Sequence, residues 1–247
     1  MLALLLLSLV TSSSAISPGP TAPADGEALI RSMYERYQGK WYRTMTFVQT
    51  TTDLRKNTKE TWYEAARIPG ILRIDIEPVD SGKTLLFRND SIYQFQGGQL
   101  KASAPFVHPL MVLGFDVYAD TPDRTLAKLK GIGFDLSKIR EDTWQGRPVY
   151  VVGAAKGDTT ARQFWIDRER LVFVRLLEPS RSGNGAIVET QFNKYQPLGN
   201  GWISVEVRFS VNGQTVTTEE YANVKGDPPL PDELFDPSKY GKPGWVE

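Results

Sequence analysis

Hydrophobic and polar residues alternate along most of the chain, and the alternation is clearest before residue 78. The run from 71 to 77 has apolar side chains on one face and charged ones on the other, namely Leu72, Ile74 and Ile76 against Arg73, Asp75 and Glu77. A side-chain period of two is typical of a half-buried strand. We therefore predict three consecutive antiparallel strands, at 41–52, 59–66 and 70–77.

The same pattern continues almost to the end of the chain. Asn89-Asp90, Gly97-Gly98 and Asn212-Gly213 are typical of short hairpin turns. Further strands are expected at 83–88, 91–96, 99–103, 138–144, 147–155, 161–167, 171–178, 186–196, 202–212 and 214–225. No repeat of fixed period and no Pro/Gly/Ser linker divides them. We expect one mainly β (α+β) domain over residues 25–247, built on a single large curved antiparallel sheet.

Three stretches break the strand pattern and predict helices. The first follows Asp25, a suitable N-cap, and ends near Gly39. A short apolar helix is expected to begin near Pro109. A third has Thr121 as its cap, Pro122 at its first position and Gly131 as its stop. The proline-rich tail is predicted to lie across the sheet, anchored by the side chains of Leu234 and Phe235.

The first 24 residues predict a secretory signal peptide and a leader. They carry no charged side chain, and the apolar run ends by Val10, before a small-residue zone around 13–15. The alternative is a membrane anchor, but the run is well short of the roughly 20 apolar residues that a transmembrane helix needs. We therefore expect an exported, soluble, periplasmic protein.

Composition excludes several kinds of site. The chain has 29 basic and 29 acidic residues, so it lacks the overall basic charge of a general nucleic-acid binder. It has no cysteine, which excludes thiol catalysis, disulfides and cysteine-based metal sites. Its only histidine is His108, so no site can use two imidazoles. We expect no metal and no cofactor.

Candidate catalytic motifs are weak. The segment 81–84 (SGKT) resembles the end of a phosphate loop, but Glu77 occupies the position of the earlier glycine, and we interpret it as a turn. Carboxylates are plentiful on the amphipathic strands, and we interpret them as solvent-facing side chains: Glu60 and Glu64, Asp75 and Glu77, Asp167 and Glu169, and Glu219 and Glu220. His108 is interpreted as a structural residue rather than a general base. We predict no enzymatic activity and no catalytic residue.

Aromatic residues are numerous: six Trp, ten Tyr and eleven Phe. Those on predicted strands include Trp41, Phe47, Trp62, Phe87, Tyr93, Phe95, Phe164, Trp165, Phe173, Phe192, Trp202 and Phe209. They could form a solid core. Alternatively, one curved sheet with few helices cannot fill its own concave face, which would leave an apolar cavity. We favour the cavity.

Several short segments support a family resemblance by their order along the chain. They are Phe47-Val48-Gln49, 67–73 (RIPGILR), 87–93 (FRNDSIY), 162–167 (RQFWID) and 230–237 (LPDELFDP), with the helices at 106–130 between the third and fourth segments. In this order they resemble the LolA/LolB-like family of periplasmic outer-membrane lipoprotein carriers, which includes RseB-type and LppX-type proteins. The resemblance covers about residues 27–238.

The resemblance implies an unclosed β-barrel, with an N-terminal helix and short lid helices over an apolar cavity that holds acyl chains. It implies that Arg67 latches the lid. The expected ligand-binding residues are Trp41, Met45, Phe47, Trp62, Leu72, Ile74, Ile76, Phe87, Tyr93, Phe95, Met111, Leu113, Phe115, Phe164, Ile166, Phe192, Val205 and Val207.

The resemblance favours a monomeric carrier of lipid or acylated lipoprotein that acts in outer-membrane lipoprotein sorting, with membrane-associated donor or acceptor proteins as further partners. Two alternatives stay open. The chain could be an exported regulatory or interaction module of the same fold without lipid cargo. It could instead be a hydrolase of cell-wall glycans or esters, which would require carboxylates that converge in a cleft.

Overall fold

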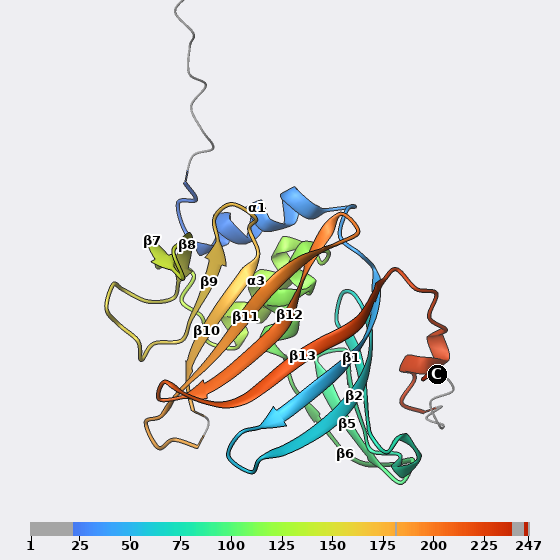
Figure 1. The fold of residues 1–247 in the computed structure, drawn as a ribbon. Helices are drawn as coiled ribbons and strands as arrows, with labels where there is room; N and C mark the ends of the chain where they lie inside the picture. The colour runs from blue at the N-terminus through green and yellow to red at the C-terminus, as the bar shows by residue number, and fades with distance from the viewer. Residues whose placement is uncertain (1–21, 181, 239–244, 247) are drawn as a thin grey trace, which may run out of the picture.

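A single antiparallel sheet forms most of the molecule (Figure 1). The computed structural model describes residues 22–180, 182–238 and 245–246, so the expected signal and leader lie outside the described residues except for 22–24. The strands are β1 (Thr44–Asp53), β2 (Thr58–Arg67), β3 (Ile71–Ile76), β4 (Thr84–Arg88), β5 (Ser91–Gln96), β6 (Gln99–Pro105), β7 (Ile139–Trp144), β8 (Arg147–Val152), β9 (Gln163–Asp167), β10 (Phe173–Pro179), β11 (Ile187–Leu198), β12 (Gly201–Val211) and β13 (Gln214–Gly226).

The order of strands in the sheet is β6-β5-β4-β3-β2-β1-β13-β12-β11-β10-β9-β8-β7. Neighbours in the sheet are neighbours in the sequence except at one place, where β1 pairs with β13. The edge strands β6 and β7 do not pair with each other within the described residues, so the sheet curves without closing into a barrel. The predicted fold class, a mainly β protein with one curved antiparallel sheet, is confirmed.

Helices lie on the concave side of the sheet. The α-helices are α1 (Gly26–Tyr37), α2 (Pro109–Gly114) and α3 (Pro122–Gly131), and the short 3-10 turns are η1 (Val79–Ser81), η2 (Asp116–Tyr118) and η3 (Asp232–Phe235). In Figure 1, α3 lies behind β11 and β12, and α1 crosses one end of the sheet. The helices contact one another: α1 and α2 each pack against α3 and η2. Together they form one helical layer on the sheet.

The helix ends agree with the sequence in part. The Asp25 carboxylate accepts a hydrogen bond of 2.7 Å from the Ala28 N–H, as an N-cap does, and Gly39 follows α1 with a positive φ of 72°. Thr121 occupies the N-cap position of α3, but its side chain makes no capping hydrogen bond. Gly131 is still within α3, and the left-handed residue after the helix is Gly133, with φ 91°.

One face of β3 was predicted to be exposed to solvent but is buried. Leu72 and Ile74 face the concave side, as the alternation predicted. Arg73 and Asp75 belong to the predicted polar face, yet they are only 4% and 1% exposed. The C-terminal segment covers them, because η3 lies against β3 and the Leu234 carbonyl accepts a hydrogen bond of 2.9 Å from Arg73.

The C-terminal segment is held by a second, smaller apolar cluster on the outer face of the sheet. Leu234 and Phe235 are buried there, which confirms them as the anchors of the tail. They pack against Ala65, Leu86 and Phe95 from β2, β4 and β5. The sheet is therefore covered twice, by helices on its concave face and by this segment on part of its convex face.

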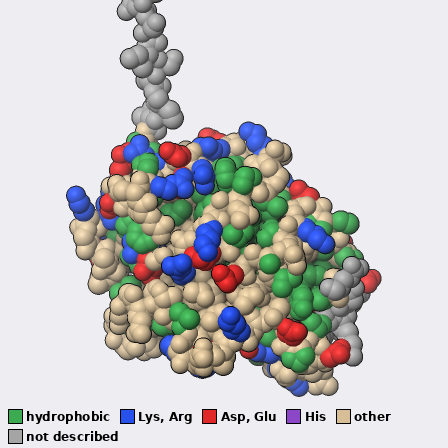
Figure 2. All heavy atoms as spheres, viewed as in Figure 1, with side chains coloured by type: hydrophobic (Ala, Val, Ile, Leu, Met, Phe, Trp, Pro, Cys, Tyr) green, Lys and Arg blue, Asp and Glu red, His purple; other side chains and the backbone are tan. Residues whose placement is uncertain are grey.

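The convex face also carries charged side chains, and its basic and acidic residues lie close to one another. In Figure 2, basic and acidic side chains lie next to each other over the middle of the sheet. Strands β10 to β12 carry the ion pairs Arg175–Glu189 at 2.6 Å and Arg208–Glu206 at 2.8 Å. Among the residues that the structure describes, no helix has both the length and the apolar character needed to cross a membrane.

Candidate functional site

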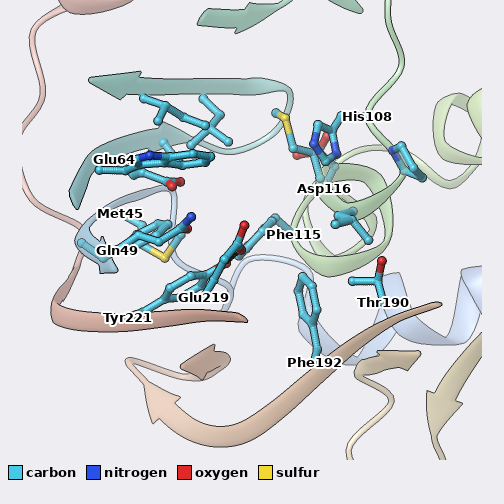
Figure 3. Close-up of a pocket in the computed structure, with 18 of the residues that line it drawn as sticks. Met45, Gln49, Glu64, His108, Phe115, Asp116, Thr190, Phe192, Glu219 and Tyr221 are labelled. Atoms are coloured by element: carbon cyan, nitrogen blue, oxygen red, sulfur yellow. Dashed lines mark hydrogen bonds between the residues drawn. The ribbon is translucent and has the colours of Figure 1, made fainter. Parts of the chain in front are cut away.

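A cavity of about 290 Å³ lies on the concave side of the sheet. Its first wall comes from β1, β2 and β3, and its second wall from β10, β11, β12 and β13. The segment 106–116, which contains α2, closes it from the helical side (Figure 3). Its volume is close to the lower end of ligand pockets, roughly 300 Å³. The sheet and the lid together therefore leave room for one short apolar chain or a small ligand.

Part of the predicted ligand-binding set meets in this cavity. The lining residues that the sequence named share an inward position on β1–β3, on or beside α2, or on β11: Met45, Phe47, Trp62, Leu72, Ile74, Met111, Phe115 and Phe192. They come from segments that are far apart in the chain. The alternation on β1 and β3 assigned their inner faces correctly, because every second side chain of a strand points to the same side.

The remaining members of the predicted set do not line the cavity. Most pack in the main core between the helices and the sheet: Trp41, Leu113, Phe164, Ile166, Val205 and Val207. Ile76 and Phe87 belong to a small cluster beside the cavity. Tyr93 and Phe95 lie on the opposite face, in the cluster under the C-terminal segment. Hydrophobicity located them correctly in apolar surroundings but could not separate cavity from core.

Arg67 lies away from the lid, contrary to the role that the resemblance implied. Its guanidinium donates hydrogen bonds of 2.5 Å to Asp232 and 2.8 Å to the Leu230 carbonyl. It also lies 5.0 Å from the ring centroid of Phe235. All of these groups belong to the C-terminal segment. Within the described residues, Arg67 therefore fastens this segment and not the lid helices.

Asp116 makes the contact between lid and sheet that was expected of Arg67. It lies in η2, directly after α2, and its Oδ1 accepts a hydrogen bond of 2.8 Å from the Gly70 N–H in the turn between β2 and β3. Its side chain is buried, and burial raises the pKa of Asp116 to about 7, although the Gly70 N–H and the Lys128 ammonium oppose this rise. The lid is thus joined to the rim of the cavity through one carboxyl group.

Close packing holds α2 against the second wall. A methyl group at Gly114 would lie 2.9 Å from the ring of Phe192, so only glycine allows α2 to approach β11 this closely. On the other side, Met111 packs with Ile74 and Phe87. The lid is therefore supported by apolar contacts to both walls, and hydrogen bonds join it to the sheet at both ends, from the Phe106 N–H to the Asp90 carbonyl at 2.7 Å and from the Gly70 N–H to Asp116.

Carboxylic acids interrupt the apolar lining, and two of them meet at one end of the cavity. Glu64 projects from β2 and Glu219 from β13 toward the same space, with the Gln49 side chain between them (Figure 3). Burial raises the pKa of Glu64 well above its ordinary value, and the charge of Glu219 raises it further. Burial also raises the pKa of Glu219 to about 7, against hydrogen bonding by Tyr221 and Gln49. The cavity therefore has an apolar body and an acidic end.

Sequence reasoning missed these acids although a signal was present. Gln49 follows Phe47 by two residues, and Glu64 follows Trp62 by two. The strand period therefore places both polar residues on the same face as the aromatic ones. We interpreted carboxylates on strands as solvent-facing, and this was wrong for Glu64, which is only 4% exposed. Glu64 could have been identified from its spacing, because a polar residue two positions from an inward-facing aromatic residue on the same strand also faces inward.

Two other kinds of site were considered in the described part of the chain: a metal site and a site that uses His108. No group of three or more His, Asp or Glu side chains there is arranged to hold a metal ion. His108 lines the cavity and precedes α2, with its ring 5.1 Å from that of Phe87 and 5.5 Å from that of Phe106. It packs as an aromatic residue at the base of the lid.

Comparison with known proteins defines the fold but not the sequence family. No protein-family model matches the chain, and no curated protein matches it. Among solved structures, a DUF1329 family protein from Desulfovibrio piger is similar with a TM-score of 0.56 and 13% identity, over 87% of this chain and 98% of the other.

Two further structures have the same architecture. A LolA superfamily protein from Nitrosomonas europaea has a TM-score of 0.55 and 11% identity, over 86% of this chain and 97% of the other. An outer membrane lipoprotein-sorting protein domain from Vibrio parahaemolyticus has a TM-score of 0.56 and 12% identity, over 85% and 95%. The chain therefore has a LolA/LolB-like fold: an unclosed antiparallel sheet with helices over an apolar cavity.

Proposed function

We propose that this protein is a carrier that binds the apolar chain of a lipid or an acylated lipoprotein in the cavity between β1–β3, β10–β13 and α2. One observation carries the proposal: an apolar cavity of about 290 Å³ lies beneath a short helical lid. An apolar chain that enters gains roughly 0.8 kcal/mol for each buried methylene group. The lid segment is held to the sheet at its two ends, where the Phe106 N–H donates to the Asp90 carbonyl and the Gly70 N–H donates to Asp116, so its middle can move without unfolding the sheet.

Two observations support a proposal for where the protein acts. The apolar, uncharged first 24 residues predict export. One of the similar structures is an outer membrane lipoprotein-sorting protein domain. We propose that the protein acts in the periplasm, in the sorting of outer-membrane lipoproteins, and receives and delivers cargo through membrane-associated partners. We assign it no catalytic role.

The first test is mass spectrometry of organic extracts from protein purified out of its native compartment. A phospholipid or acylated peptide at close to one per protein would support the proposal and identify the class of cargo. The same preparation, stripped of ligand, is then titrated with a neutral pyrene-labelled alcohol. If the extract is empty and the labelled alcohol does not bind, the carrier function is wrong, and an interaction module without lipid cargo becomes the better explanation.

A variant that fills the cavity links binding to this site. Ala66 lines the cavity and is 6% exposed, so Ala66→Leu places additional atoms in the space for the ligand. We expect the affinity for the labelled alcohol to fall at least about tenfold, or about 1.4 kcal/mol. Ala102→Leu on the exposed strand β6 adds the same atoms outside the cavity and is the matched control. Equal binding by both variants would place the ligand elsewhere.

A further inference from the structure

Glu64 is a buried acid without a partner. Its side chain is 4% exposed and points into the cavity (Figure 3). Within the described residues it makes no hydrogen bond and no ion pair, and its strand neighbours at the same level are Phe47 on β1 and Ile74 on β3. An unpaired buried carboxyl group destabilises a fold, whether it is neutral without a hydrogen bond or charged. Stability alone therefore gives no reason for this residue.

Glu219 brings a second carboxyl group to the same end of the cavity. It comes from β13, on the other side of β1, and its Oε2 accepts a hydrogen bond of 3.2 Å from the Tyr221 hydroxyl. Gln49 lies between the two acids, because on β1 it is paired with Trp62 of β2 and with Tyr221 of β13. The charge of Glu219 raises the free energy of ionising Glu64. The pair is therefore poised to accept a positive charge.

The other charged groups of the cavity already have partners. Asp116 accepts from the Gly70 N–H, and Glu178 lies 3.3 Å from the guanidinium of Arg162. Among the described residues that line the cavity there is no lysine and no arginine. A phosphate or a carboxylate in the cavity would have no cation to pair with and would face two acids. The electrostatic field of the site thus disfavours an anionic ligand and favours a cationic one.

We propose that the cavity selects an amphiphilic amine, with its apolar chain among Phe47, Leu72 and Phe192 and its ammonium group between the carboxyl groups of Glu64 and Glu219. This inference rests on the proposed function and specifies its ligand. The ammonium supplies the hydrogen-bond donors that Glu64 lacks in the protein. As it enters, at least one carboxyl group of the pair releases its proton to solvent, so the bound complex carries a carboxylate beside an ammonium group.

The test compares ligands that share a chain and differ in the polar end. Dodecylamine, dodecanol and dodecanoate are titrated by calorimetry below their micelle concentrations, in buffers of different ionisation enthalpy. We expect the amine to bind at least about tenfold more tightly than the alcohol, and the carboxylate to bind more weakly than the alcohol. We also expect proton release on binding of the amine alone, which the buffer dependence of the heat measures.

Substitutions then assign the selectivity to the acids. Glu64→Gln with Glu219→Gln keeps the shape of the cavity and removes both charges, so the preference for the amine and the proton release should disappear while dodecanol still binds. The matched control is Glu60→Gln with Glu220→Gln, two exposed acids on the same strands β2 and β13. It removes the same charge from the surface, and the preference should remain.

The outcomes separate this inference from the function on which it rests. If none of the three ligands binds, the carrier function itself is wrong. If amine, alcohol and carboxylate bind alike, the cavity is a carrier site and the amine selectivity is wrong. If the preference persists without Glu64 and Glu219, or disappears with Glu60 and Glu220, the amine is held by other groups. Because Asp116, His108, Glu178 and Tyr221 also face the cavity, pH is kept constant across the three titrations.

Discussion

Asp116 and Gly70 join the lid to the sheet: the Gly70 N–H donates a hydrogen bond of 2.8 Å to the Asp116 carboxylate. The two residues lie on different walls of the cavity opening, one after α2 and the other between β2 and β3. Asp116 is 3% exposed, so this hydrogen bond is shielded from solvent.

The contact predicts different effects for two substitutions at Asp116. Asp116→Ala removes the acceptor and leaves the Gly70 N–H without a partner, which costs about 1–3 kcal/mol of unfolding free energy. Asp116→Asn keeps an acceptor oxygen and removes the charge. Because the pKa of Asp116 is raised from 3.8 to about 7, we expect the asparagine variant to be more stable than the parent at pH 8, with a smaller advantage at pH 5 that disappears only below pH 3.8.

Urea unfolding at both pH values measures these differences, and hydrogen exchange of the Gly70 amide reports the lid contact directly. The amide should exchange faster in the alanine variant and stay protected in the asparagine variant. Equal exchange in the parent and in Asp116→Ala would mean that this hydrogen bond does not control lid opening.

Arg67→Ala should affect the C-terminal segment and leave the lid closed. The guanidinium contacts Leu230, Asp232 and Phe235, and Asp232 is largely exposed. An exposed ion pair contributes little, so we expect a loss of at most about 1 kcal/mol in unfolding free energy. Limited proteolysis should show faster cleavage after residue 226, while the exchange of the Gly70 amide stays unchanged. Faster exchange at Gly70 would restore Arg67 as a lid latch.

Asp75→Ala should be among the most destabilising single changes on the outer face. Asp75 is 1% exposed and accepts hydrogen bonds from Arg73, Thr84 and Trp245. Its removal leaves the Arg73 guanidinium, which is 4% exposed, without its carboxylate, at a cost of about 3–5 kcal/mol. Denaturant unfolding measures this. Glu77→Ala, at an exposed position just after the same strand, is the control and should change stability by less than about 0.5 kcal/mol.

The acids in the cavity predict that stability falls as pH rises. Their pKa values in the folded protein lie above the ordinary value of 4.5, well above it for Glu64 and at about 7 for Glu219. Below pH 4.5 both the folded and the unfolded chain are protonated, so the acids cost nothing. Between pH 4.5 and 7 the unfolded chain loses protons first, and stability declines, for Glu219 by up to about 3 kcal/mol.

Thermal unfolding of ligand-free protein from pH 4 to pH 8 measures this decline. Glu64→Gln with Glu219→Gln should flatten the profile and raise the melting temperature at pH 8, because no buried charge then forms. Glu60→Gln with Glu220→Gln should leave the profile as it is in the parent. A parent whose stability increases over this range would contradict the burial of the two acids.

Much of the sheet could be predicted because strand alternation is a local property of the sequence. The turn at Asn89-Asp90 shows this well: both residues have a positive φ of 53°, the conformation that a two-residue hairpin turn requires. The inward faces of Phe47 and of Leu72 followed from the same period. Local chemistry therefore located the strands, their turns and much of the concave lining.

What lies over each face depends on contacts between distant segments, and alternation contains no information about them. Arg73 looked solvent-facing because the sequence does not show that Leu234 and Phe235 cover it. Phe95 looked like a cavity residue although its side of the sheet carries the C-terminal segment. The lid contact was assigned to Arg67 by resemblance, whereas Asp116 is 46 residues from its partner Gly70 and has no distinguishing motif around it.

The pairing of β1 with β13 has a consequence for how the protein is made. Strands β1–β6 and β7–β13 are two meanders in which each strand follows its neighbour, so each half can assemble through short-range hairpins. The β1–β13 seam joins the two ends of the strand region, and closing such a long loop is slow. Phe47 and Tyr221 face the cavity from the two sides of this seam.

The cavity is therefore complete only once β1 and β13 have paired. A chain caught before that step displays the future cavity lining on two open half-sheets, each with an unpaired edge at β1 or β13. We expect such a chain to aggregate rather than to form the cavity, so under the proposed function a ligand can bind only after β1 and β13 have paired.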